Sequence, residues 1–126
     1  EYPNSYITFS LDASTPETFK KIRILDAYEK VVDNLIIVSS RRKPNQRLKI
    51  HNNINIINVG EVEGMVELAA MVKVDTLEFN PTYACPSIEV NASNAHLFKE
   101  AQKVILETAK RLGVNVVFFS DLYLNY

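Results

Sequence analysis

Apolar and polar residues alternate along several short segments of the chain, as they do in strands with one buried face. Residues 6–11 alternate in this way and are rich in β-forming residues. Residues 48–56 place isoleucine and leucine on one face and polar residues on the other, with Asn52 interrupting the apolar face. Residues 74–80, stopped by Pro81, and residues 114–119 complete the set. The pattern predicts four strands.

Between these strands, apolar residues recur at helical spacing. We expect a short helix ending at Arg23, a second over residues 26–40, a third after Gly60, and a fourth that begins at Ser93 or Asn94 and stops at Gly113. Ser14 and Glu17 have the spacing of a capping box, and Pro16 suits a first helical turn. Residues 81–93 show weak periodicity and are expected to form a long loop.

Alternation of strands with helices predicts an α/β fold of about four βα units, with a parallel sheet in sequential order. Polar residues gather on one face of the first three strands, at Thr8, Ser10 and Asp12, at Lys49, His51, Asn53 and Asn55, and at Thr76, Glu78 and Asn80. Such a sheet needs helices on one side only. It could be an open sheet with one wet face or part of a TIM-like barrel. Polar residues at the carboxyl ends of the strands favour the partial barrel.

The composition places limits on function. With 14 basic and 15 acidic residues the formal net charge is −1, so we expect no nucleic-acid partner. No apolar run approaches the roughly 20 residues that span a bilayer, so we expect no membrane partner. Cys85 is the only cysteine, which fits a reducing, cytoplasmic compartment. We read residues 1–126 as a single domain.

Most common site motifs are absent from the sequence. The chain has three glycines and none in a G-x-G-x-x-G order, and no serine stands in a nucleophile-elbow sequence. His51 and His96 lack a second ligand at a metal-binding spacing, so we expect no metal site. Ser10 and Asp12, at the end of the first strand, suit hydrogen bonds to a ribose or an amine, although Asp12 could simply begin the turn into the next helix.

Two longer segments carry a family resemblance. Residues 10–23, SLDASTPETFKKIR, followed by YEKVVDNL at residues 28–35, resemble radical S-adenosylmethionine (radical SAM) enzymes around the fourth strand of their partial barrel. Residues 54–69, INIINVGEVEGMVELA, look like the fifth strand and helix of that family, and residues 74–81 look like its sixth strand. The resemblance covers residues 6 to 81 well and is weak beyond them.

The resemblance implies a parent enzyme in which a [4Fe–4S] cluster cleaves S-adenosylmethionine (SAM) to a radical that takes hydrogen from a substrate. It implies that Ser10 contacts the amino-acid or ribose portion of SAM, that Arg23 contacts its carboxylate, and that Asn55 lines the cofactor pocket. Together with Asp12, these are the predicted cofactor-binding residues. A two-pronged hydrogen bond from a guanidinium to a carboxylate fits the role of Arg23.

The sequence departs from the family in one respect. The C-x3-C-x2-C motif that holds the cluster is absent, and one thiolate cannot replace three. We therefore expect the carboxyl-terminal part of a larger radical SAM domain, with no catalytic residue of its own, no cofactor bound, and the rest of its parent domain as partner. The parent's substrate is unknown, and an exposed sheet edge at the first strand would favour self-association. The alternative is a non-catalytic α/β interaction or regulatory domain whose polar sheet face binds a partner or faces solvent.

Overall fold

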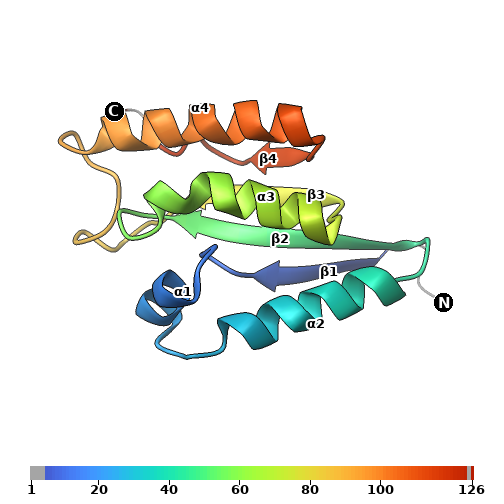
Figure 1. Ribbon diagram of the computed structural model, residues 1–126. Helices are drawn as coiled ribbons and strands as arrows, with labels where there is room; N and C mark the ends of the chain where they lie inside the picture. Colours follow the sequence, from blue (N-terminus) through green and yellow to red (C-terminus); the bar gives the residue numbers. More distant parts are fainter. Residues whose placement is uncertain (1–4, 125) are drawn as a thin grey trace.

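In the computed structural model, which describes residues 5–124 and 126, the chain forms one parallel sheet with helices packed against it (Figure 1). The sheet contains β1 (Ser5–Ser10), β2 (Gln46–Ile54), β3 (Thr76–Pro81) and β4 (Val116–Phe118) in the order β1-β2-β3-β4. All three neighbouring pairs are parallel. The prediction of an α/β fold with a sequential parallel sheet is confirmed, and the arrangement is compatible with part of a βα barrel.

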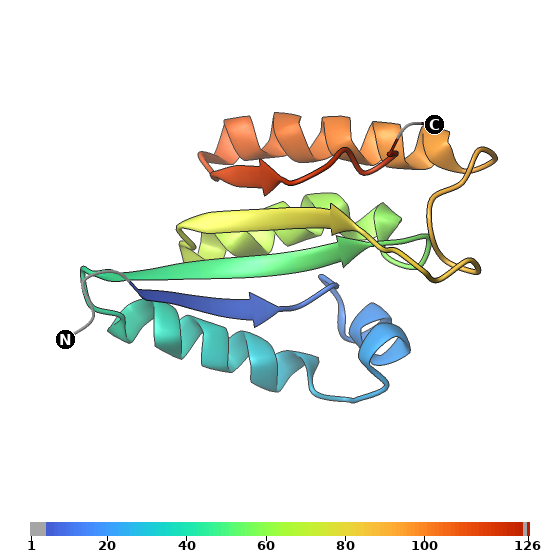
Figure 2. The same ribbon diagram turned by 180° about the vertical axis from the view of Figure 1, so that it is seen from behind.

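The helices are α1 (Pro16–Arg23), α2 (Tyr28–Arg41), α3 (Val62–Val72) and α4 (Ala95–Leu112), with a 3-10 turn at Val59–Glu61. In Figure 1 α3 lies in front of the strands, and in Figure 2, seen from behind, the strands lie in front of α3. Within the part of the chain that the structure describes, no helix is long and apolar enough to cross a membrane.

The core lies between the sheet and these helices. Side chains that point to the helix side of β2 and β3 are fully buried: Leu48, Ile50, Ile54, Leu77 and Phe79. They meet buried side chains of α3 and α4: Met65, Val66, Ala69, Phe98, Ala101 and Ile105. Burying side chains of this size supplies the main free energy of folding, about 1.5–3 kcal/mol for each large one. By contrast, only Leu35 of α2 is buried.

Several element ends differ from the sequence-based expectations. The second strand ends at Ile54, and Ile56, expected on its apolar face, is 37% exposed. The third strand begins at Thr76 and includes Pro81, which was expected to stop it. Helix α1 is capped by Thr15, whose hydroxyl accepts from the N–H of Thr18, so the predicted Ser14–Glu17 capping box is wrong.

The carboxyl ends of two helices agree with expectation. Helix α1 ends at Arg23 because Ile24 takes a left-handed conformation, and α4 stops at Gly113, whose φ is 72°. A left-handed residue after the last helical turn is the usual way to stop a helix, and glycine adopts it without steric cost. Asn94 begins α4 without a side-chain cap. The side chain of Asn91 instead accepts from the N–H groups of Ser93 and Asn94.

Gly64 of α3 allows a close approach to the turn before α1. A Cβ atom at this position would lie 2.5 Å from Ser14 Oγ and 3.0 Å from Ser14 Cβ. Gly60 is a matched control, because a Cβ there would meet nothing within 4 Å. We expect Gly64→Ala to lower the free energy of unfolding by about 1–2 kcal/mol through overpacking, and Gly60→Ala to change it by less than about 0.5 kcal/mol. Urea unfolding of both variants measures this, and equal stabilities would contradict the close approach.

Candidate functional site

The turn that follows β1 is organised around Asp12. Its φ is 62°, a conformation that aspartate and asparagine tolerate better than most residues, and its side chain is buried. The backbone N–H of Asp12 donates to Asn52 Oδ1 over 2.8 Å, and Asp12 Oδ1 accepts from the backbone N–H of Asn53 over 2.7 Å. The chain therefore leaves β1 in a direction that β2 fixes.

Arg23, the last residue of α1, reaches back to this turn. Its Nη2 lies 2.9 Å from Asp12 Oδ2, so both Asp12 oxygens are engaged. The Arg23 side chain is 36% exposed, whereas that of Asp12 is 8% exposed. A guanidinium carries five N–H donors, so Arg23 retains donors for a second carboxylate.

Ser10 and Asn55 end up in different surroundings. Ser10 is exposed on the sheet face opposite the core, in register with His51. Asn55 lies beyond the end of β2 and is buried, where its Oδ1 accepts from the N–H of Ile57 and its Nδ2 donates to Thr82 Oγ1. Asp12 and Asn55, expected on the polar sheet face, instead lie past the strand ends in the protein interior.

Asn58 connects the two strand ends. Its Nδ2 donates to the carbonyl oxygens of Asp12 and Asn53, and its Oδ1 accepts from the N–H of Asn55. Asn58 is fully buried, so these bonds satisfy backbone groups that water cannot reach. The structure thus brings Asp12, Arg23 and Asn55 to one edge of the sheet, but leaves only Ser10 and Arg23 of the predicted residues accessible to a ligand.

A cluster of charged and polar side chains on the uncovered sheet face was not predicted as a site. Glu78, 5% exposed, lies between Lys49, whose Nζ is 3.2 Å from Oε1, and His51, whose Nε2 is 3.1 Å from Oε2. Asn80 Nδ2 donates to the same Oε2 over 3.1 Å. The strand alternation placed these residues on one face, but only the register, His51↔Glu78, shows that they touch.

Glu61 anchors the start of α1. Its carboxylate accepts from the N–H and hydroxyl of Ser14 and from the hydroxyls of Thr15 and Thr18. A carboxylate at a helix amino terminus also interacts favourably with the helix dipole.

Burial, with a smaller contribution from the charge of Glu61, raises the pKa of Tyr28 above its usual value of 10.0.

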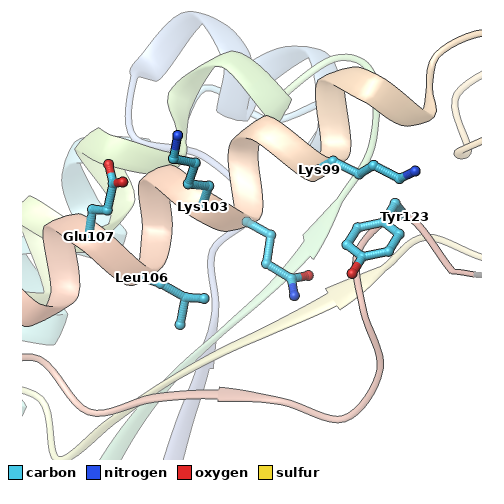
Figure 3. A pocket seen from close by; sticks show the side chains of 6 residues that line it. Lys99, Lys103, Leu106, Glu107 and Tyr123 are labelled. Atoms are coloured by element: carbon cyan, nitrogen blue, oxygen red, sulfur yellow. The ribbon is translucent and has the colours of Figure 1, made fainter.

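An open pocket of about 510 Å³ lies elsewhere, between α4 and the segment that follows β4 (Figure 3). Its walls are formed by Lys99, Gln102, Lys103, Leu106, Glu107 and Tyr123. Gln102 fixes this segment to α4, because it donates to Asp121 Oδ1 and accepts from the N–H of Leu122. The pocket adjoins the β4 side of the sheet, opposite the β1 side that carries Ser10.

The donor set does not fit an iron–sulfur cluster. Cys85 is the single cysteine of the chain, and it lies in the loop after β3. Within residues 5–124, no three His, Cys, Asp or Glu side chains come together as metal ligands. Among the residues predicted to bind SAM, the accessible donors are the hydroxyl of Ser10 and the guanidinium of Arg23.

Comparisons with protein-family models, with curated proteins and with solved structures find no match for this chain. The functional argument therefore depends on the residues and geometry described above. These divide into two parts: the turn cluster of Asp12, Arg23, Asn52 and Asn58, and the sheet-face cluster of Lys49, His51, Glu78 and Asn80. Ser10 lies between them, at the end of β1 and beside His51.

Removing the Asp12 side chain should destabilise the protein. Asp12→Ala leaves the N–H of Asn53 without its acceptor and puts alanine at a positive φ, so we expect a loss of about 1–3 kcal/mol in the free energy of unfolding. Asp12→Asn keeps an oxygen acceptor and should lose less. Asp33→Ala, on the exposed surface of α2, is the control and should stay within about 0.5 kcal/mol. An Asp12→Ala variant as stable as this control would contradict the bonding described.

The raised pKa of Tyr28 predicts a loss of stability at alkaline pH. Above about pH 10 the unfolded chain releases the phenol proton while the folded chain retains it, so the free energy of unfolding falls as pH rises through the folded-state pKa. Tyr28→Phe removes this contribution. Urea unfolding from about pH 8 to about pH 11 should give a shallower decline for Tyr28→Phe than for the wild type. Parallel declines would show that burial and Glu61 do not act on Tyr28 as described.

Proposed function

We propose that this chain is the carboxyl-terminal part of a radical SAM domain, which contributes residues for SAM and substrate in the intact protein and is not catalytic by itself. The observation that carries the proposal is the one-sided sheet: four parallel strands in sequential order, with a core on one face and a polar, uncovered opposite face. A closed or partly closed barrel turns such a face toward its lumen, where ligands bind.

The turn after β1 supports the same proposal. Ser10 and Arg23 belong to the segment that resembles the family, and both are accessible at the carboxyl edge of the sheet, where ligands of βα folds bind. Asp12 acts on the cofactor indirectly in this proposal, because it holds the guanidinium of Arg23 in place. Asn55 supports the pocket wall through Thr82 and Ile57 rather than contacting SAM.

The cluster and the reducing cofactor chemistry belong to the parent protein in this proposal. This chain would bind and orient the carboxylate end of SAM through Arg23 and Ser10. No substrate is assigned. A cytoplasmic location and the absence of a nucleic-acid partner are part of the proposal, since they follow from one free cysteine and a balanced charge.

The remainder of the parent domain is the proposed partner at β1. Within the described residues, no strand pairs with the outer side of β1, whose sequence SYITFS carries no charge. A groove of about 200 Å³ beside it is lined by Ile7, Ile37, Val38, Arg41, Arg42 and Gln46. A neutral, β-forming edge beside apolar side chains is suited to another strand, so the isolated chain should also self-associate through it.

The rival function is a non-catalytic interaction domain with a polar sheet face. It is favoured by the internal use of Asp12 and Asn55, both of which are buried and hydrogen-bonded within the chain. The two functions differ in what they require of Arg23. Only the radical SAM proposal needs its remaining N–H donors to bind a ligand carboxylate.

Titration with SAM tests the proposal on the isolated chain. Because much of the pocket belongs to the parent, we expect weak binding, with a dissociation constant on the order of 1 mM or above. Amide NMR shifts should move at Ser10, Asp12 and Arg23, and Arg23→Gln should abolish most of the movement. Arg111→Gln, on the exposed end of α4, is the matched control. SAM-induced shifts of the same size in Arg23→Gln and in the wild type would contradict the proposal. A parent coding sequence without a C-x3-C-x2-C motif upstream would contradict it too.

A further inference from the structure

His51 occupies the middle of a row of three side chains on the uncovered sheet face. Ser10 of β1 pairs in register with His51 of β2, and His51 pairs with Glu78 of β3. Because strand side chains alternate, residues in register on neighbouring parallel strands point to the same side of the sheet. The core lies on the other side, where Ile50 and Phe79 are buried. The row therefore faces the space that the proposed function assigns to ligands.

The neighbours of His51 determine which ring nitrogen carries the proton. Nε2 lies 3.1 Å from Glu78 Oε2, and Asn80 Nδ2 lies 3.1 Å from the same oxygen and 3.0 Å from Nε2. A carboxylate oxygen accepts hydrogen bonds only, and a bond to it is stronger than one between neutral groups. The contact between Asn80 Nδ2 and Nε2 would be a hydrogen bond only with Nε2 unprotonated, because an amide nitrogen donates. The carboxylate is the charged partner and forms the stronger bond, so it favours Nε2–H, with Nε2 and the Asn80 amide donating to one oxygen. In the neutral ring this leaves Nδ1 as a proton acceptor.

The carboxylate of Glu78 is fixed in position beside His51. Its Oε1 is paired with Lys49 over 3.2 Å, and neighbouring side chains leave it only 5% exposed. A carboxylate fixed behind one imidazole nitrogen orients the ring and fixes its tautomer. For Nδ1 itself, no hydrogen-bond partner exists among the residues that the structure describes, and the His51 side chain is 21% exposed.

We propose that His51 accepts a proton at Nδ1 from an O–H or N–H group of a substrate on the uncovered sheet face, with Glu78 as its positioning residue. This rests on the proposed function, which makes that face part of the substrate pocket. In the step, the substrate O–H or N–H bond breaks, its electron pair stays on the substrate, and the proton moves to Nδ1. Glu78 then stabilises the imidazolium through Nε2–H. The substrate class is a molecule with a weakly acidic hydroxyl or amide-type N–H at its reacting end.

Modification with diethyl pyrocarbonate tests the free nitrogen. An unprotonated imidazole nitrogen attacks the reagent carbonyl and becomes carbethoxylated, while ethyl carbonate leaves and decomposes to carbon dioxide and ethanol. His96, exposed at the start of α4, is an internal control in the same chain. We expect His51 to react in the wild type and its rate to fall about threefold to tenfold in Glu78→Gln, with the rate of His96 unchanged. An unreactive His51, or one indifferent to Glu78→Gln, would overturn the proposal.

A second measurement uses the wild-type protein, so its result does not depend on whether Glu78→Gln folds. Long-range ¹H–¹⁵N NMR spectra report which nitrogen of a neutral imidazole carries hydrogen. We expect Nδ1 of His51 to be the unprotonated nitrogen, and a protonated Nδ1 would overturn the assignment. The two proposals fail separately. SAM shifts at Ser10 and Arg23 with a protonated Nδ1 would remove only the role of His51. An unprotonated, reactive Nδ1 without SAM binding would remove the radical SAM assignment and the substrate pocket that depends on it, while the arrangement of His51 and Glu78 would stand.

Discussion

Burial of one face of the sheet, and only one, is the constraint on which this structure depends. The apolar side chains of β2 and β3 on the helix side, such as Leu48 and Phe79, are removed from water by α3 and α4. The alternation of strand side chains then sends the intervening residues to the opposite side. No helix covers that side among the described residues, so its side chains can be polar and can form ion pairs such as Lys49 with Glu78. The core and the candidate site are two faces of one sheet.

The sequence predicts the fold well because its main signals are local. The spacing of apolar residues identifies each element, and alternating strands and helices specify a parallel sheet. The errors fall at element ends, where contacts distant in sequence compete with local preference. Ser14 and Glu17 have capping-box spacing, yet Thr15 is the cap and the carboxylate comes from Glu61, more than forty residues later. Spacing along the chain cannot reveal a partner from another βα unit.

The candidate site is less predictable for the same reason. Alternation places Ser10, His51 and Glu78 on one face, but their meeting depends on the register of β1, β2 and β3. By the same alternation in the sequence, Asp12 and Asn55 are expected on the polar face as well. They leave the polar face because the chain turns at a positive φ after β1 and bends after Ile54. Hydrogen bonds from the side chains of Asn52 and Asn58 fix these turns. In the sequence, an asparagine that supports a turn looks the same as an asparagine that binds a ligand.

The strand order of the sheet also has a consequence for how the chain folds during synthesis. Each strand pairs with the one made just before it, so every new βα unit can add to an edge that already exists. Contacts then form between consecutive βα units, and the domain can grow from its amino-terminal end as it leaves the ribosome. Within the described residues, the outer edges of β1 and β4 both stay unpaired. A neutral strand at such an edge, as β1 is, offers its unpaired backbone groups to any strand that can reach it.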